Sequence, residues 1–255
     1  MLRFETIALE VSPRCIATVL LNRPDRRNAF NRLMLSELAT VLNEIAVDSA
    51  VRVMVLRSRG QHFCAGADLA EREGGEPDRP VGATLLDVLA SLDNLPKPTI
   101  AAVGGGAVGG GAAIVACCDI ALATEAAFFS IPEVRVGMAP VRLAPLFIRA
   151  IGNRGFRRYG LTGERMTGAE ALRLGLVHQL CAAQSLDSAV GEVADALLHG
   201  APAAMAELKA AMRRLAAPPW PAADARIGHG PPKTPEAIEG IASFRDKRKP
   251  SWYPQ

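Results

Sequence analysis

The chain has 255 residues, 49% apolar and 22% charged, which is the balance of a globular protein with a substantial core. Its 29 basic and 26 acidic residues leave a net charge of +3, which argues against nucleic acid as the main partner and suits an anionic small molecule. The N-terminal residues lack the apolar run of a secretion signal, and no uncharged stretch demands a membrane span. We therefore expect a cytoplasmic protein with no membrane partner.

Two strands are predicted near the N-terminus, over residues 6–11 and 16–22, because β-branched and aliphatic side chains alternate or run together there. Asn31 is a suitable N-cap for a helix whose apolar positions continue to Ile45. The remaining elements of this half are strands over 51–56, 99–103 and 120–124 and helices over 85–92 and 109–117. Strands that alternate with helices imply crossover connections and a mostly parallel sheet.

The C-terminal part, from residue 139 onward, has a nearly all-helical pattern, and its last helix is expected over 235–249. Four glycines interrupt this pattern: Gly152, Gly163, Gly175 and Gly200. Residues 71–80 and the proline-rich stretch 217–235 are expected to be loops. We expect a core over residues 1–190 that carries the site and a helical C-terminal region over 191–255.

The cysteines offer neither a metal site nor a disulfide framework. Their number is odd, two of them are adjacent, and no spacing matches a set of metal ligands. Reduced thiols in a cytosolic protein are the simpler interpretation. The five residues are Cys15, Cys64, Cys117, Cys118 and Cys181.

A glycine-rich segment over residues 104–109 satisfies the pattern G-x-G-x-x-G after a predicted strand, which is the pattern of a dinucleotide-binding turn. Glu125, about twenty residues on, lies where an acid that binds ribose would belong. Against this hypothesis, the pattern normally opens its domain, whereas a hundred residues precede it here. A nicotinamide or flavin enzyme therefore stays an alternative.

Three segments together resemble the enoyl-coenzyme A hydratase/isomerase (crotonase) family. The first segment is LNRP over 21–24 followed by Arg27, Asn28 and Ala29. The second is FCAGADL over 63–69, and the third is AVGGG over 107–111, which leads to Cys118 and Asp119. Each segment alone is a weak signal, but the set is specific and runs in order through nearly the whole chain. The resemblance implies an α/β fold, a crotonase-like spiral of ββα units with a helical C-terminal trimerisation region.

The resemblance also implies an acyl-coenzyme A thioester as substrate, no separate cofactor or metal, and a homotrimer or homohexamer. The backbone amides of Ala67 and Gly110 are then the pair of donors that stabilises the negative charge on the thioester oxygen of an enolate. Gly110 would begin a helix, whose N-terminal dipole adds positive potential. The alternative for the glycines alone is tight packing of a helix on a sheet.

The resemblance assigns further residues to substrate and coenzyme A binding. Asp68 is expected to hold the loop that presents the Ala67 amide, rather than to act as an acid. Phe244 and Lys247, three apart on the last helix, are expected to cover the adenine and meet a phosphate. A solvated basic tail is the alternative there. The full set of binding residues is Arg26, Ala65, Gly66, Ala67, Asp68, Leu69, Gly109, Gly110, Arg135, Phe244 and Lys247.

The catalytic acids depart from the family pattern. Hydratases of this family commonly hold water between two glutamates, of which the second aligns with Glu133 while the first position is Ala113. We therefore expect Glu133 to act as the general acid/base; a loop or capping carboxylate is the other interpretation. The segment 133–152 resembles hydratases of branched, carboxylated thioesters, such as methylglutaconyl- or isohexenylglutaconyl-coenzyme A. Arg135 and Arg142 are then candidate partners for a distal substrate carboxylate.

Four functions are therefore weighed. Hydration of an α,β-unsaturated thioester leads, and double-bond isomerisation by one carboxylate follows, because a single base can move a proton from C2 to C4. Thioester hydrolysis is third. A relative that binds coenzyme A or RNA without catalysis is fourth, and it is opposed by the presence of Glu133 and of both expected amide donors.

Overall fold

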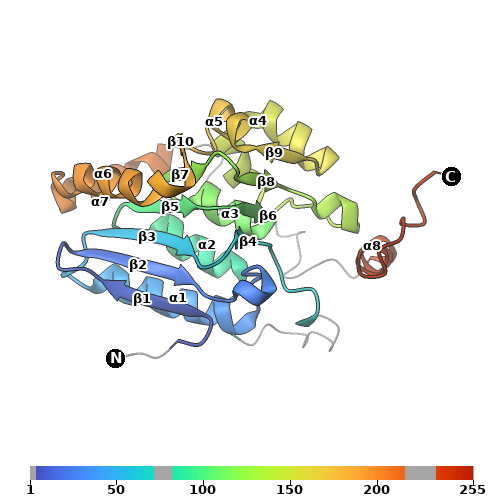
Figure 1. Cartoon of the computed structure of the whole chain (residues 1–255), viewed down its shortest axis with the longest axis horizontal. Coiled ribbons are helices and arrows are strands. Elements are labelled where there is room, and N and C mark those ends of the chain that lie inside the picture. The colour runs from blue at the N-terminus through green and yellow to red at the C-terminus, as the bar shows by residue number, and fades with distance from the viewer. Residues whose placement is uncertain (1–3, 72–81, 216–233, 255) are drawn as a thin grey trace.

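The computed structural model describes residues 4–71, 82–215 and 234–254. It is a mixed α/β fold with two sheets (Figure 1). The loops expected over 71–80 and 217–235 lie almost wholly outside the described residues. Among the described residues, no helix has both the length and the apolar character that crossing a membrane requires.

The larger sheet has six strands in the order β1-β2-β3-β5-β7-β10. β1 and β2 pair antiparallel, and every other pair in this sheet is parallel, as expected from the alternation of strands and helices. The strands are β1 (Ile7–Val11), β2 (Ile16–Leu21), β3 (Val53–Ser58), β5 (Thr99–Val103), β7 (Ile120–Thr124) and β10 (Gln179–Cys181).

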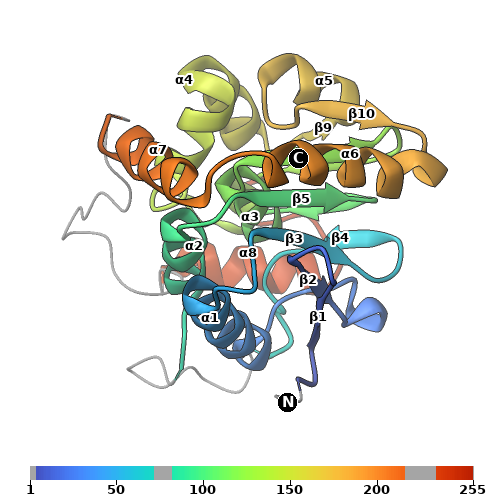
Figure 2. The ribbon, with the colours of Figure 1, turned by 90° about the vertical axis from the view of Figure 1, so that its left-hand side faces the viewer.

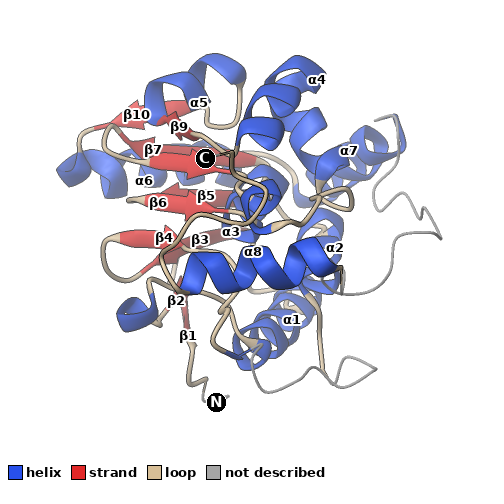
Figure 3. Cartoon of the chain, turned by 90° about the vertical axis from the view of Figure 1, so that its right-hand side faces the viewer, coloured by secondary structure: helices blue, strands red, loops and turns tan. Residues whose placement is uncertain are grey.

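The smaller sheet has four strands in the order β4-β6-β8-β9, and its strands run beside those of the larger sheet in Figure 3. They are β4 (His62–Cys64), β6 (Gly106–Val108), β8 (Phe128–Ser130) and β9 (Arg165–Thr167). The sequence analysis did not predict this sheet, nor the two strands β9 and β10 in the region expected to be nearly all helical. Each of these five strands has three residues, too few to show an alternation of apolar and polar side chains.

The helices cover both faces of the larger sheet. α1 and α2 lie side by side, and α6 runs along β5 (Figure 2). The described helices are α1 (Arg32–Val47), α2 (Leu85–Asn94), α3 (Gly110–Cys117), α4 (Ala144–Thr162), α5 (Gly168–Leu174), α6 (Leu186–Leu198), α7 (Pro202–Leu215) and α8 (Pro235–Arg245). Short 3-10 helices that lie wholly within the described residues are η1 (Pro24–Arg26), η3 (Glu133–Val136) and η4 (Ala183–Ser185).

Local signals placed several helix ends as expected. The side chain of Asn31 accepts a hydrogen bond from the Met34 amide at 2.9 Å, so it caps α1. Gly152 interrupts α4 with φ 69° and ψ 163°, and Gly163 and Gly175 end α4 and α5 in the left-handed conformation. The expected division at residue 190 falls within α6.

The C-terminal helix α8 is shorter than expected. It ends at Arg245, whereas the sequence predicted helix to residue 249, and Lys247 lies beyond the helix with φ 52°. The expectation that Phe244 and Lys247 share one helical face is therefore wrong. After the helix the chain turns back toward α8, where Arg248 forms a bidentate salt bridge with Glu239 at 2.7 and 2.8 Å. α8 lies apart from both sheets, against η3.

Candidate active site

The loop over residues 63–69 is held along the segment that precedes α1. The Phe30 amide donates to Gly66 O at 2.8 Å, and the Asp68 amide donates to Phe30 O at 2.9 Å. The Ala65 amide donates to Arg27 O at 3.0 Å. These bonds make a short parallel bridge between Phe30 and Ala67, which fixes the backbone on both sides of the Ala67 amide.

Asn28 anchors the same segment from inside. Its side chain is fully buried, and its backbone is left-handed at φ 54°, a conformation that asparagine tolerates. Its Nδ2 donates to Arg59 O and His62 O at 2.8 Å each, and its Oδ1 accepts from the Arg23 amide at 2.8 Å. Asn28 thus holds the turn from Arg59 to His62, which leads into β4.

Asp68 belongs to this holding network. Its carboxylate pairs with the Arg23 guanidinium at 3.0 Å, and both side chains are less than a fifth exposed, at 13% and 18%. Arg23 also donates to Ala29 O at 2.5 Å. The geometry matches the structural role expected for Asp68, since its charge is already neutralised by an arginine.

Two close backbone approaches bring the loop onto the start of α3. A Cβ on Gly66, whose φ is 88°, would lie 3.0 Å from Val108 O, and one on Gly111 would lie 2.5 Å from Cys64 O. Only glycine allows these approaches. Within the described residues, neither the Ala67 amide nor the Gly110 amide donates to a protein acceptor. Both expected oxyanion donors therefore lack a protein acceptor, and they lie on segments that touch each other.

Gly109 and Gly110 open α3 as the sequence predicted. Gly109 is the N-cap residue, with φ 56° and ψ −121°, and its amide donates to Ser130 O at 2.8 Å. A Cβ on Gly110 would lie 2.7 Å from side-chain atoms of both Phe30 and Leu85, so a larger residue there would require these side chains to move. The first free amides of a helix carry partial positive charge, which suits a developing oxyanion.

Glu133 lies beside Gly109. It begins η3, shortly after β8, and its Oε1 is 2.8 Å from the position that a Cβ on Gly109 would occupy. Its Oε2 is buried and has no hydrogen-bond partner among the described residues. Burial raises the pKa of the Glu133 carboxyl from 4.5 to about 7, and a hydrogen bond from its own backbone opposes this in part. Such a group both accepts and returns a proton near neutral pH.

Ala113 occupies the place of the other family glutamate. It is fully buried, one turn into α3, and its amide donates to Gly109 O at 3.0 Å. Ala113 belongs to the buried apolar core and supplies no carboxylate itself. Cys64, in the same neighbourhood, is no nucleophile, because burial raises the pKa of its thiol to about 12.

The expected binding residues divide into two groups. Ala65, Gly66, Ala67, Asp68 and Leu69 follow β4, and Gly109, Gly110 and Glu133 gather beside them. The second group lies on the surface.

In this second group, Arg26 is exposed on η1, and Phe244 is 65% exposed on α8. Arg135 is exposed too, and its Nε donates to Thr162 O at 2.9 Å, at the end of α4. Contact of these residues and of Lys247 with coenzyme A stays a prediction.

Sequence reasoning quoted Arg23 and Asn28 as parts of a motif without a role. Asn28 is a polar residue within a family segment, and the structure buries it completely. A buried polar side chain needs hydrogen-bond partners, which is why Asn28 matters for this loop. The contact between Gly137 and α8 was not predicted from the sequence either, because the glycine itself was the only signal for it.

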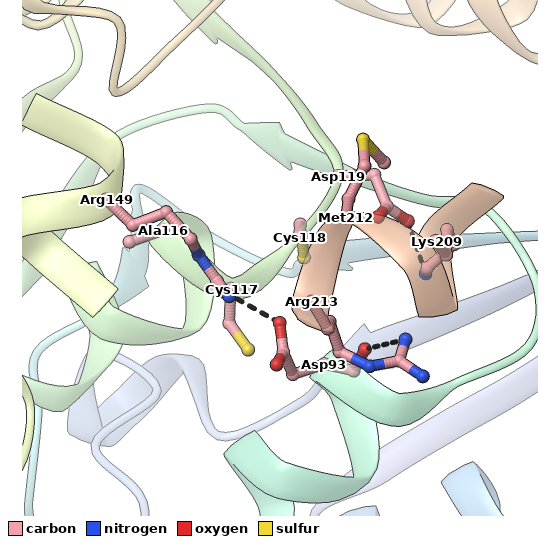
Figure 4. A pocket seen from close by; sticks show the side chains of 9 residues that line it. All are labelled: Asp93, Ala116, Cys117, Cys118, Asp119, Arg149, Lys209, Met212 and Arg213. Carbon is pink, nitrogen blue, oxygen red and sulfur yellow. Dashed lines mark hydrogen bonds and ion pairs between the residues drawn. The ribbon is translucent and has the colours of Figure 1, made fainter. Parts of the chain in front are cut away.

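A separate cavity of about 100 Å³ lies at the other end of α3 (Figure 4). Two ion pairs lie in it, Arg149 with Asp93 at 2.7 Å and Lys209 with Asp119 at 2.6 Å, and Arg213 donates to Asp93 O at 2.9 Å. Burial raises the pKa of the Cys117 thiol well above its usual value, so the cavity holds no activated nucleophile. We interpret this cluster as a clasp that holds α7 on the core. Among the described residues, no group of three or more His, Cys, Asp or Glu side chains could hold a metal.

The comparison with known proteins decides the family. The model of the enoyl-CoA hydratase/isomerase family matches residues 12–255. The chain belongs to this family. The carnitinyl-CoA dehydratase of Escherichia coli (strain K12) is 34% identical over an alignment of 251 positions, which covers 93% of this chain and 94% of that one.

Two solved structures agree with the enoyl-CoA hydratase/isomerase assignment. An enoyl-CoA hydratase from Mycobacterium avium subsp. paratuberculosis K-10 has a TM-score of 0.82 at 26% identity, with 99% of this chain and 100% of that chain covered. An enoyl-CoA hydratase from Shewanella pealeana ATCC 700345 has a TM-score of 0.78 at 31% identity, covering 98% and 97% of the two chains.

The dinucleotide-binding hypothesis is wrong for this family member. The segment 104–109 does not turn directly from a strand into a helix, because Gly106–Val108 forms β6 of the smaller sheet. A dinucleotide-binding turn needs a helix immediately after its strand to receive the pyrophosphate.

Proposed function

We propose that the protein catalyses reversible addition of water to an α,β-unsaturated acyl-coenzyme A thioester, with Glu133 as the general acid/base. The observation that carries this proposal is the Glu133 carboxyl itself: its pKa is about 7, its Oε2 is buried without a partner, and it lies beside the free amide end of α3. A carboxyl left unpaired in an apolar site is costly for folding, and a proton-transfer role accounts for it.

The proposed reaction uses Glu133 first as a base and then as an acid. Ionised Glu133 takes a proton from water while the water oxygen bonds to C3 of the thioester. The electrons of the double bond move to the carbonyl oxygen, where the Ala67 and Gly110 amides stabilise the enolate. The carbonyl then re-forms as C2 takes the proton from Glu133. Loss of one such amide donor costs roughly 3–4 kcal/mol of transition-state stabilisation.

The substrate is proposed to be branched or carboxylated. Support comes from the likeness of residues 133–152 to hydratases of such thioesters and from the exposed side chain of Arg135 in η3. The relative named carnitinyl-CoA dehydratase supports water chemistry on a thioester, as opposed to isomerisation.

Isomerisation of the double bond is the second candidate. The specific observation in its favour is the buried Ala113, because only one of the two family glutamate positions then supplies a carboxylate for proton transfer. One carboxylate suffices to move a proton from C2 to C4, whereas hydration also needs water to be held in place.

We further propose that the protein works in the cytoplasm as a homotrimer or homohexamer. Arg26, Phe244 and Lys247 would bind the coenzyme A part of the substrate. Their exposure leaves them accessible to a ligand or to a neighbouring subunit.

One experiment separates the candidates. The protein is incubated with crotonyl-, 3-enoyl- and 3-methylglutaconyl-coenzyme A, and the products are analysed by mass spectrometry. Gain of one water by an α,β-unsaturated substrate supports hydration, while a shifted double bond at unchanged mass identifies an isomerase. Release of free coenzyme A identifies a hydrolase, and no product from any thioester contradicts the proposal.

A further inference from the structure

α8 and η3 touch backbone to backbone. A Cβ on Gly137, the residue that ends η3, would lie 2.3 Å from Glu236 O. A Cβ on Gly240, in the middle of α8, would lie 2.4 Å from the Val136 carbonyl carbon. Real Cβ atoms do not approach backbone this closely, so the contact requires glycine on both sides. Gly137 also has a φ of 70°, which favours glycine for a second reason.

The face of α8 that makes this contact consists of small buried residues. They are Ala237, Gly240 and Ser243, spaced three apart and therefore on one side of the helix. The opposite face is open, since Ile238 is 65% exposed. α8 thus docks through a narrow face that fits only the backbone of η3.

The contact reaches the catalytic carboxylate through one turn of chain. The Met138 amide donates to Glu133 O at 3.0 Å, so the turn through Gly137 closes on the backbone of Glu133 itself. The Glu133 Oε2 has no hydrogen-bond partner among the described residues. The direction of that carboxylate is therefore set largely by where the backbone of η3 lies.

We propose that Gly137 and Gly240 are positioning residues, and that the docking of α8 on η3 holds the Glu133 carboxylate in its catalytic place. This inference rests on the proposed role of Glu133. It assigns to the C-terminal helix a function inside its own chain, in addition to any contact with coenzyme A.

The test substitutes Gly240→Ala, with Gly191→Ala on α6 as the matched control. A Cβ on Gly191 meets nothing within 4 Å, whereas one on Gly240 meets three backbone atoms within 2.7 Å. Alanine is more favourable than glycine in a helix interior by about 1 kcal/mol, so neither substitution weakens the helix that carries it. Ala237→Val, which adds bulk to the same buried face, is the second variant. Circular dichroism establishes that each variant is folded.

We expect kcat to fall about 10- to 100-fold in Gly240→Ala, with KM changed less than about threefold, because a displacement of the base acts on the chemical step. The ascending limb of kcat/KM against pH should also move below pH 7, because water that reaches Glu133 lets its pKa return toward 4.5. Gly191→Ala should match the wild type in both measurements.

The charged groups around η3 do not offer another cause for such a shift. Burial, and not a neighbouring charge, is the cause of the raised pKa at Glu133. The charged residues on the elements packed against η3, and on η3 itself, are Glu236, Glu239, Arg245, Arg149, Arg154, Arg157, Arg158 and Arg135.

Unchanged kcat and an unmoved pH limb in folded Gly240→Ala and Ala237→Val would overturn the inference. That outcome would leave the role of Glu133 intact, because Glu133→Gln tests it separately. Conversely, a fully active Glu133→Gln enzyme would remove the proposed function, whatever the glycine variants do.

Discussion

At the scale of single residues, the burial that suits Glu133 to its proposed catalytic role also lowers the stability of the protein at neutral pH. Its carboxyl has a pKa of about 7 in the folded protein against 4.5 when exposed. Between these values the folded state binds more protons than the unfolded state, so stability falls as pH rises from 4.5 to 7 and the loss is complete above that. Ionising such a group costs at most about 3 kcal/mol.

Glu133→Gln should therefore stabilise the protein at pH 8 by up to about 3 kcal/mol and at pH 5 by less than about 1 kcal/mol. The amide resembles the protonated carboxyl in shape and lack of charge, which is why the gain appears only where the wild type must ionise. Urea unfolding of both proteins at the two pH values measures the difference. An equal effect at pH 5 and pH 8 would show that ionisation is not its source.

At the scale of elements, the loop with the Ala67 amide depends on the buried side chain of Asn28. Asn28→Ala removes three hydrogen bonds and leaves Arg59 O and His62 O without their donor. We expect a loss of roughly 1–3 kcal/mol in the free energy of unfolding.

Turnover should fall as well, because the amide donor moves with the loop. Exposed Asn43 on α1 provides the control, as Asn43→Ala. Normal turnover in a destabilised Asn28→Ala variant would show that the hydrogen bonds of Asn28 do not contribute to catalysis.

The clasp at the far end of α3 should affect stability alone. Lys209 is 7% exposed and pairs with Asp119, while also donating to Lys97 O at 2.8 Å. Lys209→Met removes the cation from Asp119, whose side chain is 27% exposed and keeps its hydrogen bonds from Thr99, so we expect a loss of about 1–3 kcal/mol.

Thermal and urea unfolding measure this loss, and Arg214→Met, at an exposed position on α7, is the control. A variant with native stability would contradict the clasp. Loss of kcat in the folded variant would tie this cavity to the active site.

The elements also show where sequence reasoning ends. Strands such as Thr99–Val103 and Ile120–Thr124 were predicted to the residue because continuous apolar runs of this length have few alternatives. The oxyanion segments and Glu133 came from family motifs. The smaller sheet could not be predicted, since its three-residue strands exist through pairing with distant segments. The glycine contact between α8 and η3 is likewise a property of tertiary packing.

At the scale of the whole molecule, the C-terminal region should link assembly, coenzyme A binding and catalysis. Deleting residues 236–255 removes α8 from η3 together with Phe244 and Lys247. We expect the truncated protein to lose affinity for coenzyme A and to form smaller assemblies than the full chain. Light scattering and a coenzyme A titration measure both. If the truncated chain assembles and binds as the full chain does, the shared role fails.

The central claim is that Glu133 transfers the proton in the reaction of the enoyl thioester. Its most direct test is the turnover of Glu133→Gln on the best thioester substrate, measured beside the affinity for that substrate. We predict that kcat falls by about 100-fold or more while thioester affinity is retained, because the variant keeps the shape of the site and loses the proton-transfer group. Turnover equal to that of the wild type would contradict the account.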